Sequence, residues 1–395
     1  MLKKTRLLTP GPTMIPERVQ QAMGQPILHH RTPGFAELFQ EIQRGLKYFF
    51  QTQNDVLSIL TSGTGAMDAA VCNLFSPGDC VITINGGKFG ARWTKIAEAY
   101  QLQPIEITLA PGETLAMAQL ENAYLAATNK GLIPKALLCQ ASETSTGLLY
   151  PVQAIADWAR RIRTSNSNFL LVVDAITALG VFELPMDDFD IDVLITGSQK
   201  ALMIPPGLAF LALSNRAWQA VDSSKINKFY LDFKKERKGL SKGQTAWTPG
   251  TTLLMGLAES LKIVQEESLP EAFKRHALLA EATRLAIKAM GLKLLSEKAP
   301  SNAVTAVCVP AEIENGKLIP KTMRDEFGVT IAGGQDALEG KIFRLTHLGY
   351  IDRFDIITGI SALELCLYKL GYQKFSLGAG VTAALNYFNL QESQL

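Results

Sequence analysis

The sequence has 395 residues, of which 39 are lysine or arginine and 37 are aspartate or glutamate, so its net charge is +2. This length is enough for two or three domains, and the near balance of charge gives no general attraction to nucleic acid or to an anionic membrane. The five cysteines are scattered and form no C-x-x-C pair, which argues against a disulfide framework and against a bound metal such as zinc or an iron–sulfur cluster.

The first 16 residues are predicted to form an extended arm. The apolar residues before Pro10 are too few for the core of a secretory signal peptide. No uncharged apolar run elsewhere reaches about 18 residues, so we expect no membrane span. The expected compartment is therefore the cytoplasm.

Residues 17–255 are predicted to form a large α/β domain, because short aliphatic and β-branched runs alternate with longer amphipathic stretches. This pattern is typical of a mostly parallel sheet covered by helices. The clearest helix signal covers residues 32–50, where Thr32 can cap the helix and Pro33 suits its first turn. The seven predicted strands are residues 56–61, 81–85, 104–109, 136–140, 169–174, 193–197 and 207–213.

The character of the sequence changes after about residue 253. Two long helical patterns, through residues 257–264 and 271–290, are followed by strand signals at 303–309 and 341–346. We therefore predict a smaller C-terminal α+β domain over residues 256–395.

Residues suited to ligand binding follow the predicted strands. Ligands of open α/β sheets bind beyond the carboxyl ends of the strands. After the first strand, the small residues 62–66 could hold a phosphate with backbone N–H groups, although a plain tight turn has the same composition. After the second strand, Phe89 could stack on a planar ligand or belong to the core.

Three later strands are followed by hydroxyl, acidic and amine side chains. The run Glu143-Thr144-Ser145-Thr146 could bind ligand oxygens or form an ordinary turn, and Asp174 could meet a ligand or serve in a cap or ion pair. Lys200 ends a buried strand, and partial desolvation there favours the neutral amine that attacks an aldehyde. A phosphate seat, an aromatic ring, a buried acid and a Schiff-base lysine, in this order, fit pyridoxal phosphate.

The same segments resemble a known family, the class V aminotransferases of the fold type I pyridoxal-phosphate enzymes, and within it the alanine–glyoxylate and serine–pyruvate branch. The resemblance covers nearly the whole chain. It rests on Thr9-Pro10-Gly11-Pro12, Ser62-Gly63-Thr64-Gly65, Asn85-Gly86, Phe89-Gly90, Ser145-Thr146-Gly147, Val173-Asp174, Gly197-Ser198-Gln199-Lys200-Ala201-Leu202, Pro205-Pro206-Gly207, Phe229-Tyr230-Leu231-Asp232 and Arg344-Leu345.

The resemblance implies a role for each of these positions. Lys200 would form the Schiff base with the cofactor, Asp174 would pair with its pyridine nitrogen, and Arg344 would bind the substrate carboxylate. Phe89 and Ile176 would pack on the two faces of the cofactor ring. Thr64, Gly65, Ala66 and Gln199 would bind its phosphate, and Ser145 would approach the ring or its phenolic oxygen.

The resemblance also implies a homodimer with active sites at the interface. Residues 244–249 resemble a segment that crosses this interface, so that Thr245 and Thr248 would reach the cofactor phosphate of the partner. Thr245 stands where some relatives carry tyrosine.

These residues predict transamination of a small amino acid, alanine or serine, with glyoxylate or pyruvate as the acceptor. No further cationic residue is evident for a side-chain carboxylate. One alternative on the same fold is a cysteine desulfurase-like lyase, whose branch typically has histidine before the lysine and over the ring, where this chain has Gln199 and Phe89. Another is a non-enzymatic accessory subunit of a redox assembly.

Overall fold

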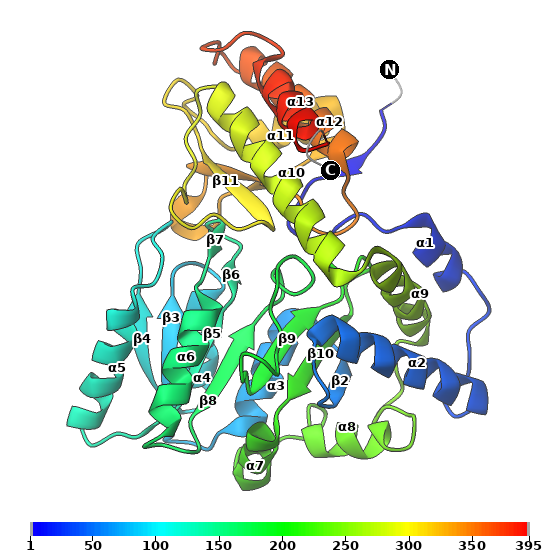
Figure 1. The fold of residues 1–395 in the computed structure, drawn as a ribbon, viewed down its shortest axis with the longest axis vertical. Helices are drawn as coiled ribbons and strands as arrows, with labels where there is room; N and C mark the ends of the chain where they lie inside the picture. Colours follow the sequence, from blue (N-terminus) through cyan, green and yellow to red (C-terminus); the bar gives the residue numbers. More distant parts are fainter. Residues whose placement is uncertain (1–2, 393–395) are drawn as a thin grey trace.

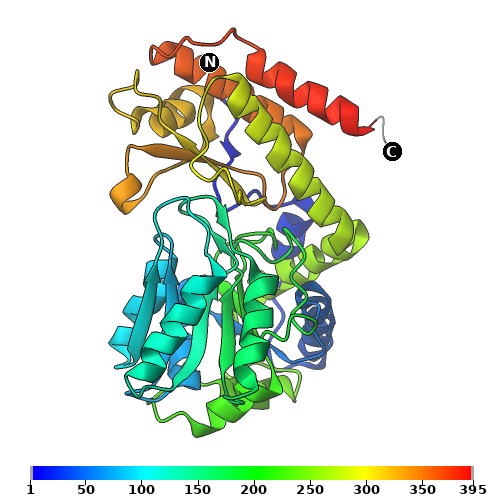
Figure 2. The same ribbon diagram turned by 60° about the vertical axis from the view of Figure 1, so that its left-hand side comes forward.

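Two α/β parts make up the fold, and the computed structural model describes residues 3–392 of the chain. The larger part, in the lower half of Figure 1, contains a central sheet with helices on both faces. The smaller part lies above it, and Figure 2 shows the same arrangement after a rotation. None of the helices in the described residues combines the length and the apolar character that crossing a membrane requires.

The large sheet consists of the seven strands that the sequence predicts, in the spatial order β2-β10-β9-β8-β5-β3-β4. Six strands run in the same direction, whereas β10 is antiparallel to both of its neighbours. The predicted mostly parallel sheet is therefore confirmed, and the carboxyl ends of six strands meet at one edge. Their bounds are β2 (Val56–Leu60), β3 (Cys80–Asn85), β4 (Gln103–Thr108), β5 (Pro134–Gln140), β8 (Leu170–Asp174), β9 (Val193–Gly197) and β10 (Leu208–Leu213).

Alternate side chains of these strands enter two apolar cores on opposite faces of the sheet. In β9, Leu194 belongs to one core and Val193 and Ile195 to the other. The first core is covered by α2 (Pro33–Phe50), α5 (Met117–Asn129), α6 (Val152–Arg163) and α9 (Thr251–Glu267). The second is covered by α3 (Gly63–Leu74), α4 (Gly90–Ala99) and α7 (Asn215–Ser223). Burial on both faces explains why the inner strands are apolar throughout, whereas the edge strand β4 is largely exposed and carries polar residues.

The helix predicted over residues 32–50 is confirmed as α2. The hydroxyl oxygen of Thr32 accepts a hydrogen bond from the N–H of Phe35 at 3.4 Å, and Pro33 occupies the first helical position. The apolar face of α2 packs against one face of the sheet.

The smaller part has a core of its own and contains both secondary-structure types, as predicted. Its elements are β11 (Val304–Cys308), β13 (Ala332–Gly333), β14 (Ile342–Thr346), α10 (Leu269–Ala289), α11 (Leu318–Phe327), α12 (Arg353–Lys369) and α13 (Ala379–Glu392). The domain boundary at residue 255 stays a prediction. This position lies inside α9, whose buried side chains belong to a core of the large sheet.

The N-terminal arm joins the two parts. Strand β1 (Arg6–Leu7), which the sequence analysis did not predict, pairs with β12 (Val329–Thr330) of the smaller part. The carbonyl of Leu8 then accepts a hydrogen bond from the N–H of Thr346 in β14 at 3.1 Å. Beyond this point the arm continues past the carboxyl edge of β9 to α1 (Glu17–Met23).

Candidate active site

A cavity of about 200 Å³ lies at the carboxyl edge of the large sheet. The structure brings six of the predicted site residues together in its wall. The wall consists of Ser62, Gly63, Thr64, Phe89, Arg92, Ser142, Thr144, Asp174, Ile176, Thr177, Gln199 and Lys200, most of which directly follow a strand of the sheet. The segments that form it are far apart in the sequence but meet where parallel strands end.

Lys200 follows β9 by three residues and is held by the N-terminal arm. Its side-chain amine donates a hydrogen bond to the carbonyl of Pro10. Gly11 has φ of +122°, a backbone conformation that favours glycine, and a Cβ atom there would displace the end of the Lys200 side chain. Burial lowers the pKa of Lys200 to about 8; the charge of Asp174 opposes this shift and that of Arg344 adds to it. A large fraction of this amine is therefore neutral near pH 8.

Asp174 ends β8 and points a buried carboxylate into the cavity. One of its oxygens accepts a hydrogen bond from the N–H of Ile176 at 2.8 Å. Burial raises the pKa of Asp174 to about 6, an effect that this backbone bond opposes. No ion pair to Asp174 occurs within residues 3–392. A protonated ring nitrogen would supply the missing partner.

The N-terminus of α3 forms the candidate phosphate seat, within the residues 62–66 that the sequence suggests. Ser62 caps the helix: its hydroxyl oxygen accepts from the N–H of Gly65 at 3.4 Å, and its carbonyl accepts from the N–H of Ala66 at 3.1 Å. Gly65 and Ala66, expected as phosphate ligands, therefore use their N–H groups inside the chain and lie outside the cavity wall. The N–H groups of Gly63 and Thr64 open the helix and remain suited to an anion.

Gln199 also indicates that a ligand binds in this cavity. Its side-chain oxygen is buried in the cavity wall and has no hydrogen-bond partner. A buried polar atom without a partner is costly, and it indicates that a ligand completes the site. The residues present therefore fit a cofactor with a phosphate, a pyridine ring and an aldehyde.

Ser145, expected at the ring or its phenolic oxygen, does not line the cavity. Its hydroxyl donates to the carboxylate of Glu143 at 2.5 Å and accepts from the N–H of Lys88 at 3.0 Å. Thr144 lines the wall instead, and its hydroxyl shares a hydrogen bond of 2.8 Å with that of Thr177. Both hydroxyls of this pair lie where the ligand would bind.

Arg344 extends from β14 of the smaller part towards the large domain. It is 3% exposed and donates to the carbonyl of Gly333 from two nitrogens, at 2.8 and 3.1 Å, and to the carbonyl of Thr144 at 2.9 Å. Burial lowers the pKa of Arg344 to about 10, so it stays charged at neutral pH. In the described part of the chain no carboxylate forms an ion pair with it. Arg344 does not line the cavity itself, but its buried charge, which has no ion-pair partner among the described residues, acts on Lys200.

The sequence analysis missed three wall residues, namely Arg92, Ser142 and Thr177. Arg92 is a further cation in the wall, and its hydrogen bond to Thr64 places it at the phosphate seat. A signal for it existed, because it follows Phe89 by three residues at a helix start and therefore shares its face.

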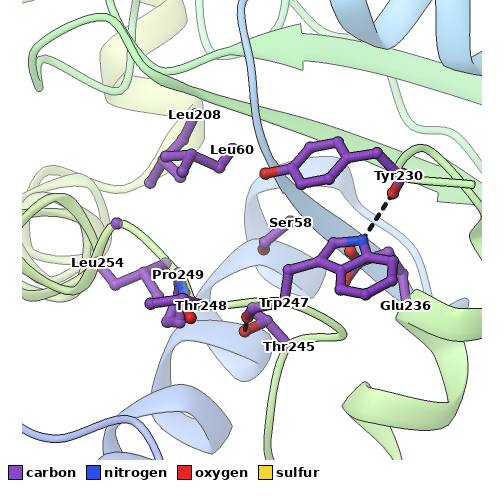
Figure 3. A pocket seen from close by; sticks show the side chains of 11 residues that line it. Ser58, Leu60, Leu208, Tyr230, Glu236, Thr245, Trp247, Thr248, Pro249 and Leu254 are labelled. Atoms are coloured by element: carbon purple, nitrogen blue, oxygen red, sulfur yellow. Dashed lines mark hydrogen bonds between the residues drawn. The ribbon is translucent and has the colours of Figure 1, made fainter.

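Thr245 and Thr248 line a second pocket, shown in Figure 3, and not the cavity around Lys200 of the same chain. The hydroxyl of Thr245 donates to the carbonyl of Trp247 at 2.6 Å, and the indole N–H of Trp247 donates to the carbonyl of Tyr230 at 2.8 Å. The contact of the two threonines with a partner's cofactor stays a prediction.

Comparison with known proteins identifies the family. The sequence profile described as Aminotransferase class-V matches residues 6–349. The chain belongs to the class V aminotransferases. It is 39% identical to the soluble hydrogenase 42 kDa subunit of Anabaena cylindrica, over 98% of this chain and 99% of that protein. It is 32% identical to serine–glyoxylate aminotransferase of Arabidopsis thaliana, over 96% and 94% of the two chains. The crystal structure of alanine–glyoxylate aminotransferase from Nostoc sp. superposes with a TM-score of 0.86 at 29% identity, over 93% and 96%.

These comparisons confirm the predicted family, the fold type I architecture and the enzyme class. The chain is a pyridoxal-phosphate-dependent aminotransferase. Across residues 3–392, no group of three His, Cys, Asp or Glu side chains is placed to hold a metal ion, and the five cysteines are free thiols.

Proposed function

We propose that this class V aminotransferase transfers the amino group of alanine or serine to glyoxylate or pyruvate, and that it works as a homodimer in the cytoplasm. Similarity to a serine–glyoxylate and to an alanine–glyoxylate aminotransferase supports these substrates. The observation that carries the proposal is Arg344, a buried guanidinium without a counterion whose charge acts on Lys200.

Bound pyridoxal phosphate supplies the electron sink for the charge that develops when the α-carbon of the substrate loses its proton. The amine of Lys200 is the base for this proton, and its pKa of about 8 makes the neutral form available near that pH. The carboxylate of Asp174 keeps a proton on the ring nitrogen. Arg344 binds the α-carboxylate through a bidentate pair, which orients the α-carbon towards Lys200.

A small donor is favoured by the space that is left. The cavity of about 200 Å³ must hold the cofactor ring as well as the substrate. Arg92 also lies in the wall, but its bond to Thr64 places it at the phosphate seat on α3. The cavity therefore leaves little room for a second substrate carboxylate, and Arg92 is not placed to bind one.

The half-reaction with a panel of amino acids tests the substrate class. Alanine and serine should convert the visible absorbance band of the holoenzyme faster than aspartate or glutamate does. Arg344→Ala should raise KM for the amino acid about 100-fold, because a charge-assisted pair is lost, and should weaken cofactor binding much less. Arg284→Ala is the control, since Arg284 is also a buried arginine of the smaller part but already pairs with Glu281 at 2.8 Å. Equal effects of Arg344→Ala on substrate and cofactor, or a preference for aspartate, would contradict the proposal.

The homodimer is supported by exposed aromatic side chains beside the two threonines. Phe229 is 72% and Tyr230 43% exposed, and both stack on Trp247. Exposed apolar groups of this size are typical of an interface. A hybrid of one Lys200→Ala chain and one Thr248→Val chain should contain one site with wild-type cofactor affinity if Thr248 serves the partner. A hybrid without such a site would place Thr248 at the cofactor of its own chain, and unchanged cofactor affinity in the Thr248→Val homodimer would place it outside the cofactor site.

The name of the Anabaena relative supports a second candidate, an accessory subunit of a redox assembly. Its signature would be stable co-purification with other subunits and no cofactor absorbance. Release of sulfide from cysteine would instead favour desulfuration.

A further inference from the structure

The cavity wall holds a cation that the roles above do not use. Arg92 lies in the first turn of α4, and one of its terminal nitrogens donates to the hydroxyl of Thr64 at 2.7 Å. Its guanidinium carbon lies 5.0 Å from the centroid of the Phe89 ring. The ion pairs formed by residues 3–392 include none to Arg92. A hydroxyl and a ring face orient this charge, but neither neutralises it.

The charge balance of the wall shows what Arg92 could bind. Its ionisable side chains are Arg92, Asp174 and Lys200. Lys200 is committed to the aldehyde and Asp174 to the ring nitrogen. A phosphate monoester carries roughly −1.5 to −2 charges at pH 7, whereas a helix N-terminus supplies only about half a positive charge. The seat on α3 is therefore short of positive charge without a further cation.

Arg92 is attached to a rigid part of the large domain, next to this seat. The N–H of Gly90, two residues before it, donates to the buried carboxylate of Glu143 at 2.8 Å. The next residue, Trp93, is fully buried in the core on the same face of the sheet as α3. The hydrogen bond to Thr64 then joins the start of α4 to the start of α3.

We propose that Arg92 pairs with the phosphate of the cofactor within the same chain, beside the N–H groups of Gly63 and Thr64. A guanidinium suits this role because its planar array of donors matches two phosphate oxygens. The inference rests on the proposed cofactor site around Lys200, but not on which amino acid is the substrate.

The test compares two aldehydes that differ only in the phosphate. Apoprotein is titrated with pyridoxal phosphate and with pyridoxal, and the dissociation constant is read from the Schiff-base absorbance. Arg92→Gln should weaken binding of pyridoxal phosphate roughly 10- to 100-fold and leave that of pyridoxal within about twofold. Arg92→Lys, which keeps the charge, should recover part of the loss. Inorganic phosphate should compete with pyridoxal phosphate more weakly in Arg92→Gln than in the wild type.

The control is Lys95→Gln, which removes the same charge from an exposed position one turn further along α4 and should change neither constant. Equal weakening of both aldehydes by Arg92→Gln would overturn the proposal, because it would show a role in ring stacking or in folding. Unchanged binding of pyridoxal phosphate would overturn it as well. Failure of the cofactor site itself would differ from both, since the wild type would then not bind pyridoxal phosphate saturably.

Discussion

Replacing Asp174 by asparagine should stabilise the apoprotein while it damages the cofactor site. Burial without a cationic partner raises the pKa of Asp174 from its ordinary 3.8 to about 6. Because one pKa unit corresponds to about 1.4 kcal/mol, the ionised carboxylate costs the folded apoprotein roughly 3 kcal/mol above pH 6. Asparagine has almost the same shape, can accept the N–H of Ile176, and carries no charge.

The stability difference between Asp174→Asn and the wild type should depend on pH. A carboxyl group whose pKa is higher in the folded state binds its proton more tightly there, so stability increases as pH falls from about 6 towards 3.8. Asp174→Asn should therefore be more stable than the wild type by up to about 3 kcal/mol at pH 7 to 8, and the difference should vanish near pH 4. Urea unfolding of both apoproteins, followed by tryptophan fluorescence at several pH values, measures this.

Asp192→Asn is the matched control, because it is the same substitution at a similarly buried position. Asp192 is fully buried but receives charged hydrogen bonds from Arg163 at 2.5 Å and Arg216 at 2.6 Å. Breaking this network should destabilise the protein by about 3–5 kcal/mol, the opposite sign. If Asp174→Asn also destabilised the apoprotein at pH 8, the carboxylate would have a cationic partner in the apoprotein and the reasoning would be wrong.

Two further substitutions test the supports of the site. Gly11→Ala should sharply reduce borohydride trapping of Lys200 with pyridoxal phosphate. The new methyl group would meet the amine, and the backbone strain costs about 1–3 kcal/mol. Gly34→Ala is the control and should leave trapping unchanged, because no atom lies within 4 Å of its Cβ. Glu143→Gln should weaken cofactor binding about tenfold in an absorbance titration, because an amide NH₂ would face the N–H of Gly90 in place of a carboxylate oxygen. Unchanged binding would show that this contact does not position the loop between β3 and α4.

The sheet could be predicted from the sequence because most of its strands are buried on both faces. Such strands are continuous apolar runs, and all seven predicted runs agree with the observed strands within two residues at each end. The sequence does not show that β10 runs antiparallel, because an apolar run has no signal for its direction. Lys200 and Asp174 were found for the same reason, since each follows such a run directly or after a short turn.

Contacts within the turns were harder to predict. Ser145 was expected at the cofactor, but a carboxylate only two residues away binds its hydroxyl. Gly65 and Ala66 were expected at the phosphate, but Ser62, which caps α3, accepts hydrogen bonds from their N–H groups. In both cases the composition of the turn was interpreted correctly, while the side chain or N–H group facing the cavity depends on hydrogen bonds that the pattern does not contain.

Backbone groups hold each of the three charged side chains Lys200, Arg344 and Asp174. Lys200 donates to the carbonyl of Pro10, Arg344 to the carbonyls of Gly333 and Thr144, and Asp174 accepts from a backbone N–H. Backbone dipoles orient a charge without neutralising it, whereas a carboxylate beside Arg344 would compete with the carboxylate of the substrate. The arrangement keeps all three charges available to ligands, and burial shifts their pKa values more than the neighbouring opposite charges offset. Function at this site therefore depends on the course of the backbone at residues 10–11, 144 and 333 as much as on the charged side chains themselves.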